Sequence, residues 1–346
     1  MKRTFQLAFP NGPFGDPLLV VRPRLSARLL LFDCGDATAL GPRQLLAASD
    51  VFLSHGHVDH VFGLGRLLRL RLGRSDRPLR IHGPAGTAAR VAAHLAGYCW
   101  NLVDAYPLDL EVREWDGATL ERRRFPAAGG FAPELIERRR AEPPATFLED
   151  DEMVVEALAL DHGGIASLAF RARERAAYNI DPAALAARGL PTGPWLARVK
   201  EALRRGDPPE TSIALPTGGA APLGELRDAL VIVSPGDSLV YAADAAPTEA
   251  TAEGLAAFAR GARRLVVEAH FLEEDAELAR RNAHLTARLA GEIARKAGVA
   301  AASPVHFSTR YDDRAEAVCE EFRAAAAPVP LEELPRLPAP LPGDAA

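Results

Sequence analysis

The sequence is poor in cysteine and has no long apolar run. Its three cysteines, Cys34, Cys99 and Cys319, are widely spaced and odd in number, which excludes a disulfide framework and favours a reducing compartment. A membrane-spanning helix is excluded because no stretch of about 18 apolar residues is present. Residues 1–6 lack the apolar segment of a secretory signal. We therefore expect a cytoplasmic protein.

Lysine is nearly absent, since all but three of the 41 basic residues are arginines. This bias lowers the information carried by any isolated arginine. Acidic residues number 46 and the net charge is −5, so the strongly basic class of nucleic-acid proteins is excluded. A local basic surface on a neutral body is still compatible with nucleic acid as a substrate.

Strand-like and helix-like segments alternate along most of the 346 residues, which predicts a layered α/β domain over residues 1–330. Residues 331–346 are proline-rich and predict a loosely packed tail. Residues 178–223 are rich in proline, glycine and alanine, with a short helical piece at 194–204. They are too long for an ordinary loop, so they are either disordered or part of a functional arm inserted at roughly 171–225.

Three of the nine histidines gather in residues 54–60, which read SHGHVDH and follow an apolar strand-like run. His55, His57 and Asp59 are two residues apart and face one side of an extended segment, and His60 follows at the start of a helix. Imidazole and carboxylate at this density suit zinc, or manganese and iron less specifically. The pattern predicts a metal site rather than histidines satisfied in a polar loop.

Three further donors, His162, Asp244 and His306, each follow a strand-like run. The carboxyl ends of strands are where α/β folds place their sites. Together with the histidine cluster these residues supply enough ligands for two divalent ions, which act as a pair when ~3.5–4 Å apart. A set of nitrogen and oxygen donors without cysteine indicates a catalytic rather than a structural metal centre.

Several segments resemble known proteins. Residues 31–36 (LFDCGD), the cluster at 55–60 and residues 61–64 (VFGL) are similar to the metallo-β-lactamase superfamily. Residues 188–196 (RGLPTGPWL) resemble the exosite arm of ribonuclease Z, the endonuclease that trims the 3′ trailer from precursor tRNA, and further likeness lies at 268–272, 283–287 and 306–311. The resemblance implies a four-layer αβ/βα sandwich, with two mixed sheets face to face, helices outside and an inserted arm.

The resemblance also implies a role for each candidate residue. One metal ion would be held by His55, His57 and His162. The other would be held by Asp59, His60 and His306, with Asp244 bridging the two. A hydroxide between the metals would attack the phosphorus.

The remaining roles concern protons and support. Asp59 would accept the proton of the attacking water, and His284 would donate one to the departing oxygen. Glu268 would orient His284, and Asp33 would fix the metal loop.

The chain departs from the ribonuclease Z pattern at three places. The His-Glu-Ala-Thr stretch has Val267 in place of its first histidine, and the bridging carboxylate is flanked by Ala243 and Ala245. The family's N-terminal loop is replaced at residues 9–15. None of these departures removes a predicted ligand. They bear on which RNA is the substrate and on how fast it is cleaved.

Residues 171–205 contain eight basic and three acidic residues, which predicts a basic arm that binds the phosphate backbone of RNA. The predicted contacts are Arg188, Arg198, Lys200, Arg204 and Arg205. Further arginines on the helix after the metal cluster would extend this face: Arg66, Arg69, Arg71 and Arg74.

We therefore expect a metal-dependent hydrolase that cleaves precursor tRNA at its 3′ end with two divalent ions, zinc foremost. The resemblance implies a homodimer in which the arm of one subunit holds substrate for the other. One alternative is a small-molecule phosphodiesterase, thioesterase or lactonase on the same dinuclear site. Another is an RNA-binding protein that retains the metal pocket without catalysis.

Overall fold

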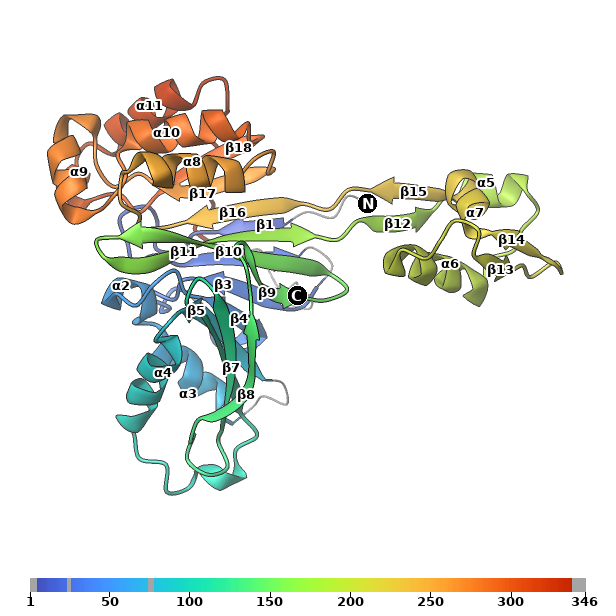
Figure 1. Ribbon diagram of the computed structural model, residues 1–346, viewed down its shortest axis with the longest axis horizontal. Coiled ribbons are helices and arrows are strands. Elements are labelled where there is room, and N and C mark those ends of the chain that lie inside the picture. The colour runs from blue at the N-terminus through green and yellow to red at the C-terminus, as the bar shows by residue number, and fades with distance from the viewer. Residues whose placement is uncertain (1–4, 24–25, 74–77, 338–346) are drawn as a thin grey trace. The chain divides into compact units, whose positions relative to one another are not determined.

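The computed structural model describes residues 5–23, 26–73 and 78–337, and it divides into two compact units (Figure 1). The larger unit consists of Phe5–Glu149, Val154–Arg173 and the chain from Ser238 onward. The smaller unit contains Asp150–Met153 and Glu174–Asp237. Arg74 and the end of the predicted tail, residues 338–346, lie outside the described residues.

An eight-stranded sheet forms the first half of the larger unit. Its strands lie side by side in sequence order: β1 (Phe5–Ala8), β2 (Leu19–Pro23), β3 (Leu29–Phe32), β4 (Ala48–Phe52), β5 (Leu79–Pro84), β6 (Asp109–Trp115), β7 (Thr119–Pro126) and β8 (Glu134–Arg140). The central strands β3 to β6 are parallel and the outer ones antiparallel.

A six-stranded sheet forms the second half. Its strands lie in the order β18 (Ala301–Val305), β17 (Arg264–Glu268), β16 (Ser238–Ala242), β11 (Ile165–Glu174), β10 (Met153–His162) and β9 (Ala145–Glu149). Strands β16, β17 and β18 are parallel, whereas β11 runs antiparallel to β16. Both sheets are therefore mixed, as predicted.

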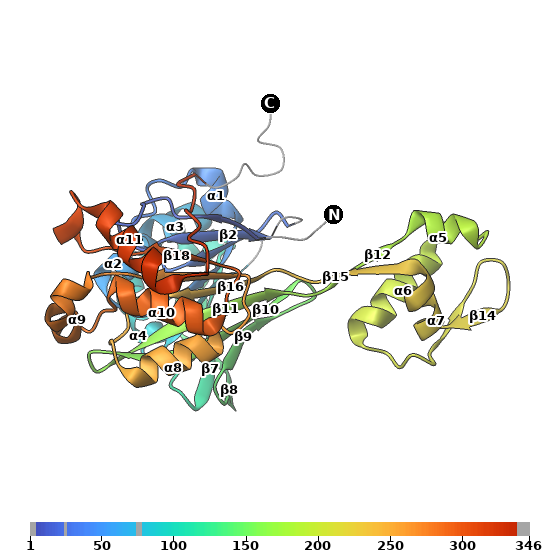
Figure 2. The ribbon, with the colours of Figure 1, turned by 90° about the horizontal axis from the view of Figure 1, so that it is seen from above.

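Helices cover the outer faces of both sheets (Figures 1 and 2). The first sheet is accompanied by α1 (Pro42–Ala47), α2 (Val58–Val61), α3 (Leu64–Arg71), α4 (Thr87–Ala96) and the short 3₁₀ turn Val103–Ala105. The second is accompanied by α8 (Glu249–Phe258), α9 (Ala276–Asn282), α10 (Ala287–Ala297), α11 (Ala315–Ala326) and the 3₁₀ turns Glu273–Asp275 and Thr309–Tyr311.

Aromatic side chains fill the space between the two sheets. Phe32 of β3 stacks on Phe52 of β4 with ring centroids 4.9 Å apart. From the other sheet, Phe170 lies 5.4 Å from Phe52, and Tyr241 lies 5.9 Å from Phe32. Because strand side chains alternate between faces, Leu29 and Leu31 point instead to the helices. The four-layer arrangement predicted for the fold is confirmed.

The smaller unit has its own small core. Strand β12 (Ala177–Ile180) pairs with β15 (Val231–Ser234), and β13 (Ser212–Ala214) pairs with β14 (Ala220–Pro222). The helices are α5 (Pro182–Ala187), α6 (Pro194–Arg205) and α7 (Leu223–Leu230). Leu185, Trp195, Val199 and Leu226 are buried among them. The disordered alternative for residues 178–223 is therefore wrong. That this unit serves as an arm stays a prediction.

Within the described ranges, none of the helices is long and apolar enough to cross a lipid bilayer. The three cysteines are free, and Cys34 is buried.

Candidate metal centre

The histidine cluster lies on the loop after β4 and on helix α2. The loop carries His55, which is buried, and His57, which is exposed and precedes the first turn of α2. Asp59 and His60 follow within α2, and His60 is fully buried. The remaining predicted ligands come from the second sheet. His162 ends β10, Asp244 follows β16, and His306 follows β18.

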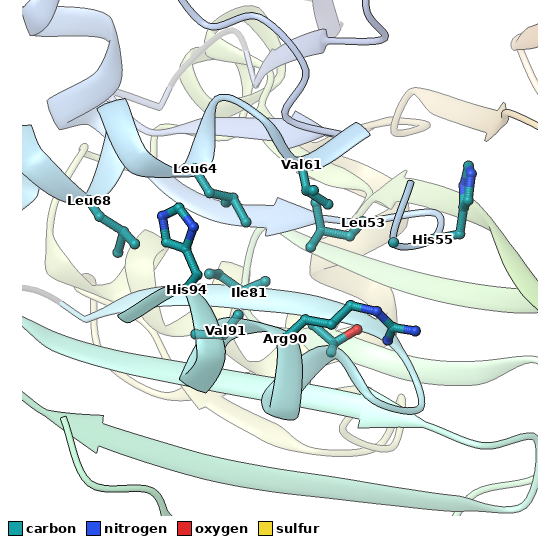
Figure 3. Close-up of a pocket in the computed structure, with 11 residues that line it drawn as sticks. Leu53, His55, Val61, Leu64, Leu68, Ile81, Arg90, Val91 and His94 are labelled. Atoms are coloured by element: carbon teal, nitrogen blue, oxygen red, sulfur yellow. The ribbon is translucent and has the colours of Figure 1, made fainter. Parts of the chain in front are cut away.

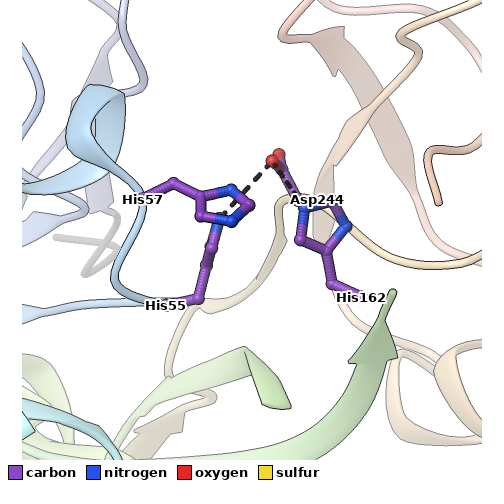
Figure 4. Close-up of side chains that lie close together, drawn as sticks. All are labelled: His55, His57, His162 and Asp244. Carbon is purple, nitrogen blue, oxygen red and sulfur yellow. Dashed lines mark ion pairs between the residues drawn. The ribbon is translucent and has the colours of Figure 1, made fainter. Parts of the chain in front are cut away.

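The structure brings all seven predicted ligands together in two groups. In the first, the ligand atoms of His55, His57, His162 and Asp244 all lie within 4.8 Å of one another (Figure 4). Nε2 of His55 and Nε2 of His162 are each 3.6 Å from Oδ2 of Asp244. This is the set expected for the first ion, together with the bridging carboxylate.

The second group contains Asp59, His60 and His306, whose ligand atoms also lie within 4.8 Å of one another. Oδ2 of Asp59 is 3.3 Å from Nε2 of His60 and 3.6 Å from Nε2 of His306. Asp244 faces this group too, with Oδ2 at 3.4 Å from Nε2 of His60 and Oδ1 at 2.7 Å from Nδ1 of His306. Asp244 thus lies between the two groups.

The chemistry of these side chains fits divalent ions. The Nε2 atoms of His55 and His60 are buried and have no hydrogen-bond partner among the residues that the structure describes. Buried polar atoms nearly always have a partner, so two nitrogens without one, aimed at a shared carboxylate, suit a cation. Burial, followed by the charge of His60, lowers the pKa of His55 to about 3. Its ring is therefore in the neutral form that binds metal.

Asp33 supports the loop that carries His55 and His57. Its carboxylate accepts hydrogen bonds from the backbone N–H of Ser54 at 2.7 Å and from the hydroxyl of Tyr241 at 2.7 Å. It also lies 2.8 Å from Nδ1 of His60, which turns Nε2 of that ring toward Asp244. Such carboxylate support fixes the orientation of a ligating histidine. The expected place of Asp33 behind the ligands agrees with this geometry.

The backbone helps to orient both His162 and His306. Nδ1 of His162 donates to the carbonyl of Ala283 at 2.8 Å, which leaves Nε2 directed at the cluster. His306 has a φ of 55°, which is uncommon for a residue other than glycine. Burial alone would lower the pKa of His306, but the charge of Asp244 raises it to about 10.

His284 and Glu268 form a dyad beside the two groups. Oε2 of the buried Glu268 accepts from Nδ1 of His284 at 2.8 Å, and Oε1 accepts from the backbone N–H of Ala245 and of Leu285. Burial lowers the pKa of His284, but the Glu268 charge outweighs it and raises the pKa above its ordinary value. Nδ1 of His284 is 4.0 Å from Asp244. The contact between Glu268 and His284 agrees with the orienting role that the resemblance implies for Glu268.

One residue of the site, His270, is not among the predicted ligands or catalytic residues, although it lies in one of the segments that resemble ribonuclease Z. Its ring stacks on that of His284, with centroids 4.0 Å apart and planes within 12° of each other. Its Nδ1 donates to the carbonyl of His306 at 2.9 Å. The signal was available, because His270 lies two residues beyond Glu268 at the end of β17.

The predicted basic residues belong to the smaller unit. Arg188, Arg198 and Arg204 are exposed, and they have no ion-pair partner among the described residues. Arg205 is paired with Asp207 at 2.6 Å and Glu201 at 3.3 Å. Lys200 is half-buried.

The charge count changes once the unit is defined. Glu174–Asp237 contains seven basic and eight acidic residues, so the excess of positive charge is confined to residues 188–205. Arg171 and Arg173 belong to β11 of the larger unit, where both pair with Glu156.

The prediction that Arg71 extends a basic surface is wrong. Its side chain is buried, and Nη1 donates to the carbonyls of Leu46 at 2.9 Å and Ala48 at 2.8 Å. This arginine therefore joins α1, α3 and β4, while Arg66 and Arg69 are exposed.

Sequence comparison gives the chain its family. It is 34% identical over 247 residues to ribonuclease Z of Deinococcus radiodurans, which covers 70% of this chain and 71% of that protein. The chain belongs to the ribonuclease Z family. Ribonuclease Z of Bradyrhizobium diazoefficiens is 30% identical over 326 residues, with 92% of this chain and 90% of that protein covered. No family model matches the chain.

Solved structures place this ribonuclease Z family member in the metallo-β-lactamase fold. Human short-form tRNase Z superimposes with a TM-score of 0.54 at 16% identity and covers 99% of this chain and 100% of its own. The metallo-β-lactamase fold protein YhfI of Bacillus subtilis gives 0.54 at 14% identity, with 95% and 96% covered. The predicted family and fold class are confirmed.

Proposed function

We propose that this protein is an endoribonuclease that hydrolyses the phosphodiester at the 3′ end of precursor tRNA. One observation carries the proposal. Six nitrogen and oxygen donors form two groups of three with Asp244 facing both, beside a His284–Glu268 dyad. They do so in a chain that is 34% and 30% identical to two ribonucleases Z.

The first group would hold one divalent ion and the second group another, with Asp244 bridging. Zinc is the proposed metal because imidazole nitrogens dominate the donor set. When bound, two such metal ions lower the pKa of water and offset the charge that develops on phosphoryl oxygens.

The protein's own groups handle the protons. Asp59 is only partly covered by its neighbours, so its carboxylate can reach the attacking water and accept a proton from it. His284 gives its proton to the departing oxygen, and Glu268 holds the ring in place for this transfer. The oxygen of water bonds to phosphorus as the original P–O bond breaks.

The smaller unit would bind RNA through its exposed cations. The exposed cations of residues 188–205 can neutralise backbone phosphates, whose release of counterions favours binding. We further propose a homodimer, in which this unit of one subunit serves the site of the other. A cytoplasmic location stays a prediction from the free cysteines.

The test uses the purified protein with its metal content measured. We expect cleavage of a precursor tRNA at the end of the acceptor stem, together with hydrolysis of a chromogenic phosphodiester. Asp59→Ala should abolish both reactions while RNA binding persists. Hydrolysis of the small diester without any cleavage of the RNA would contradict the proposal and indicate a small-molecule phosphodiesterase. RNA binding with neither reaction would indicate a binding protein.

A further inference from the structure

One ring nitrogen of His270 has no role in the proposed cleavage. Nδ1 lies 2.9 Å from the carbonyl oxygen of His306, and because a carbonyl can only accept, this nitrogen carries a proton. Burial, followed by the charge of His284, lowers the pKa of His270 to about 3, so the ring is neutral near pH 7. Nε2 therefore carries no proton, and it can only accept a hydrogen bond.

This acceptor is open to its surroundings. The ring of His270 is half-buried, and Nε2 makes no hydrogen bond to any of the residues that the structure describes. It is not one of the buried polar atoms left without a partner. Nε2 of His270 is therefore accessible to a substrate group.

The position of the ring indicates which part of the substrate this group belongs to. His270 stacks on His284, with ring centroids 4.0 Å apart and planes within 12° of each other. Nδ1 of His284 donates to Glu268, so the proton for the departing oxygen is the one on Nε2 of His284. A substrate group that donates to His270 must therefore be attached next to the departing oxygen.

A further metal ion is a poor match for this nitrogen. Glu268, His270, His284 and His306 do offer ligand atoms within 4.8 Å of one another. However, both oxygens of Glu268 accept hydrogen bonds, and both nitrogens of His306 face carboxylates. Only His284 is left as a partner. Imidazole lone pairs lie in the ring plane, and two stacked, nearly parallel planes do not meet at one ion.

A ribose 2′ hydroxyl fits all of these conditions. In a nucleotide that leaves through its 3′ oxygen, the 2′ hydroxyl is on the adjacent carbon and has a proton to donate. We infer that Nε2 of His270 accepts a hydrogen bond from the 2′ hydroxyl of the nucleotide that keeps the departing oxygen. His270 thus selects ribose over deoxyribose at the cleavage position, since the 2′ hydroxyl is what distinguishes RNA from DNA. This inference rests on the proposed function, which supplies the RNA.

The test is equilibrium binding of two reaction products to the metal-loaded protein. Both are tRNAs that end at the cleavage position, one with a terminal ribose and the other with a terminal 2′-deoxyribose. We expect the wild-type protein to bind the ribose product about fivefold more tightly, which is on the order of one hydrogen bond between neutral groups. Single-turnover cleavage of precursors with and without one 2′-deoxy substitution at the same nucleotide should show at least this preference.

His270→Asn is the decisive variant. Its amide N–H can replace Nδ1 and keep the support of His306, but the shorter side chain has no atom at the place of Nε2. The two products should bind to it within about twofold of each other. His270→Ala should lose the preference too. Each comparison is a ratio within one protein sample, so a loss of metal affects both products equally.

The matched control is the same substitution outside the metal centre. His94 extends from α4 toward Leu64 and Leu68 of α3, away from the ring of His55 (Figure 3). His94→Asn should keep the full preference for the ribose product.

The inference is overturned if the wild-type protein binds both products equally, or if His270→Asn with the wild-type metal content keeps the preference. A third bound metal ion that is lost in His270→Asn would also overturn it, because Nε2 would then be a ligand. Cleavage of precursor tRNA is scored separately. A ribose preference in binding without any cleavage would contradict the proposed function alone, and cleavage without a ribose preference would contradict only the role of His270.

Discussion

At the scale of single residues, Glu268 accepts a hydrogen bond from Nδ1 of His284, so only the proton on Nε2 is left for donation to the leaving group. With its carboxylate replaced in Glu268→Gln, the charge that favours the protonated ring is lost. We expect cleavage of precursor tRNA to fall about 100-fold or more, because general acid catalysis contributes on that order. Hydrolysis of a p-nitrophenyl diester should fall much less, since its leaving group needs no proton. Glu277→Gln, on the exposed side of α9, is the matched control.

The metal content of Glu268→Gln should equal that of the wild-type protein. An equal loss of rate on both substrates would contradict the role of the dyad in protonating the leaving group.

His270 is also expected to act through its neighbours. It supports the carbonyl of His306, whose backbone is in the left-handed region, and its ring covers that of His284. If the proposed two ions are bound, His270→Ala should lower their number toward one, as measured by elemental analysis. His270→Gln retains a donor and should restore much of the loss. Full metal occupancy in His270→Ala would show that His306 needs no such support.

At the scale of elements, β4 and β5 are joined by a buried charge. Asp50 lies opposite Arg80 in the register, with 2.8 Å between Oδ1 and Nε, and Nε2 of His82 donates to Asp50 at 2.9 Å. Burial alone would raise the pKa of Asp50, but the hydrogen bond of His82 and the charge of Arg80 hold it well below its usual range. Burial lowers the pKa of His82, so its ring is neutral near pH 7.

This arrangement makes stability depend on pH. Because the pKa of Asp50 is lower in the folded protein, its contribution is complete above the unfolded value of about 4 and is lost as the pH falls through the folded value. Asp50→Asn should lower the unfolding free energy by about 3 kcal/mol at pH 7. The difference from wild type should shrink below about pH 4, as measured by urea unfolding. A pH-independent difference would contradict a charged Asp50.

The junction of α2 and α3 leaves no room for a side chain. A Cβ atom at Gly63 would collide with the carbonyl oxygen of Gly35, while the backbone N–H of Gly63 donates to the backbone carbonyl of Cys34 at 2.8 Å. Gly63→Ala should destabilise the protein by about 2 kcal/mol, as overpacking does, and weaken metal binding through α2. Gly41→Ala, whose new Cβ meets its first neighbour at 3.7 Å, is the control. Equal melting temperatures for the two variants would contradict this close approach.

Some elements could not be read from the sequence. Residues 119–140 carry two runs of three consecutive arginines, at 122–124 and 138–140, yet they include the strands β7 and β8. These strands are held by partners far apart in the chain, such as Arg138 and Glu121 or Arg124 and Asp109. A local sequence pattern cannot reveal such cross-strand pairs. An apolar strand such as β3, by contrast, can be recognised from its own run of buried residues.

At the scale of the whole molecule, each unit has a core of its own. This separation allows residues 179–232 to be replaced by a short glycine-serine turn, because Tyr178 and Val233 are partners in β12 and β15. We expect the shortened protein to keep its hydrolysis of a chromogenic diester and to lose cleavage of precursor tRNA by about 100-fold or more. Retained RNA cleavage would contradict the role of the smaller unit in binding.

The site was more predictable than its surroundings. His55, His57, Asp59 and His60 lie within six residues of sequence, and His162, Asp244 and His306 each end or follow a strand. The supporting contacts were less accessible, because Tyr241 meets Asp33 across 208 positions of sequence. Only the folded sheets bring such residues together.

The origin of the ligands has a consequence for how the protein matures. His55, His57, Asp59 and His60 follow β4 of the first sheet, whereas His162, Asp244 and His306 end or follow strands of the second sheet. Any cation bound by residues of both sets links two halves of the larger unit that are synthesised one after the other. The first ligand group is complete once Asp244 has been synthesised, whereas the second group also needs His306, which follows β18. We therefore expect the second ion to be acquired last, and chelation should loosen the two sheets from each other before either one unfolds.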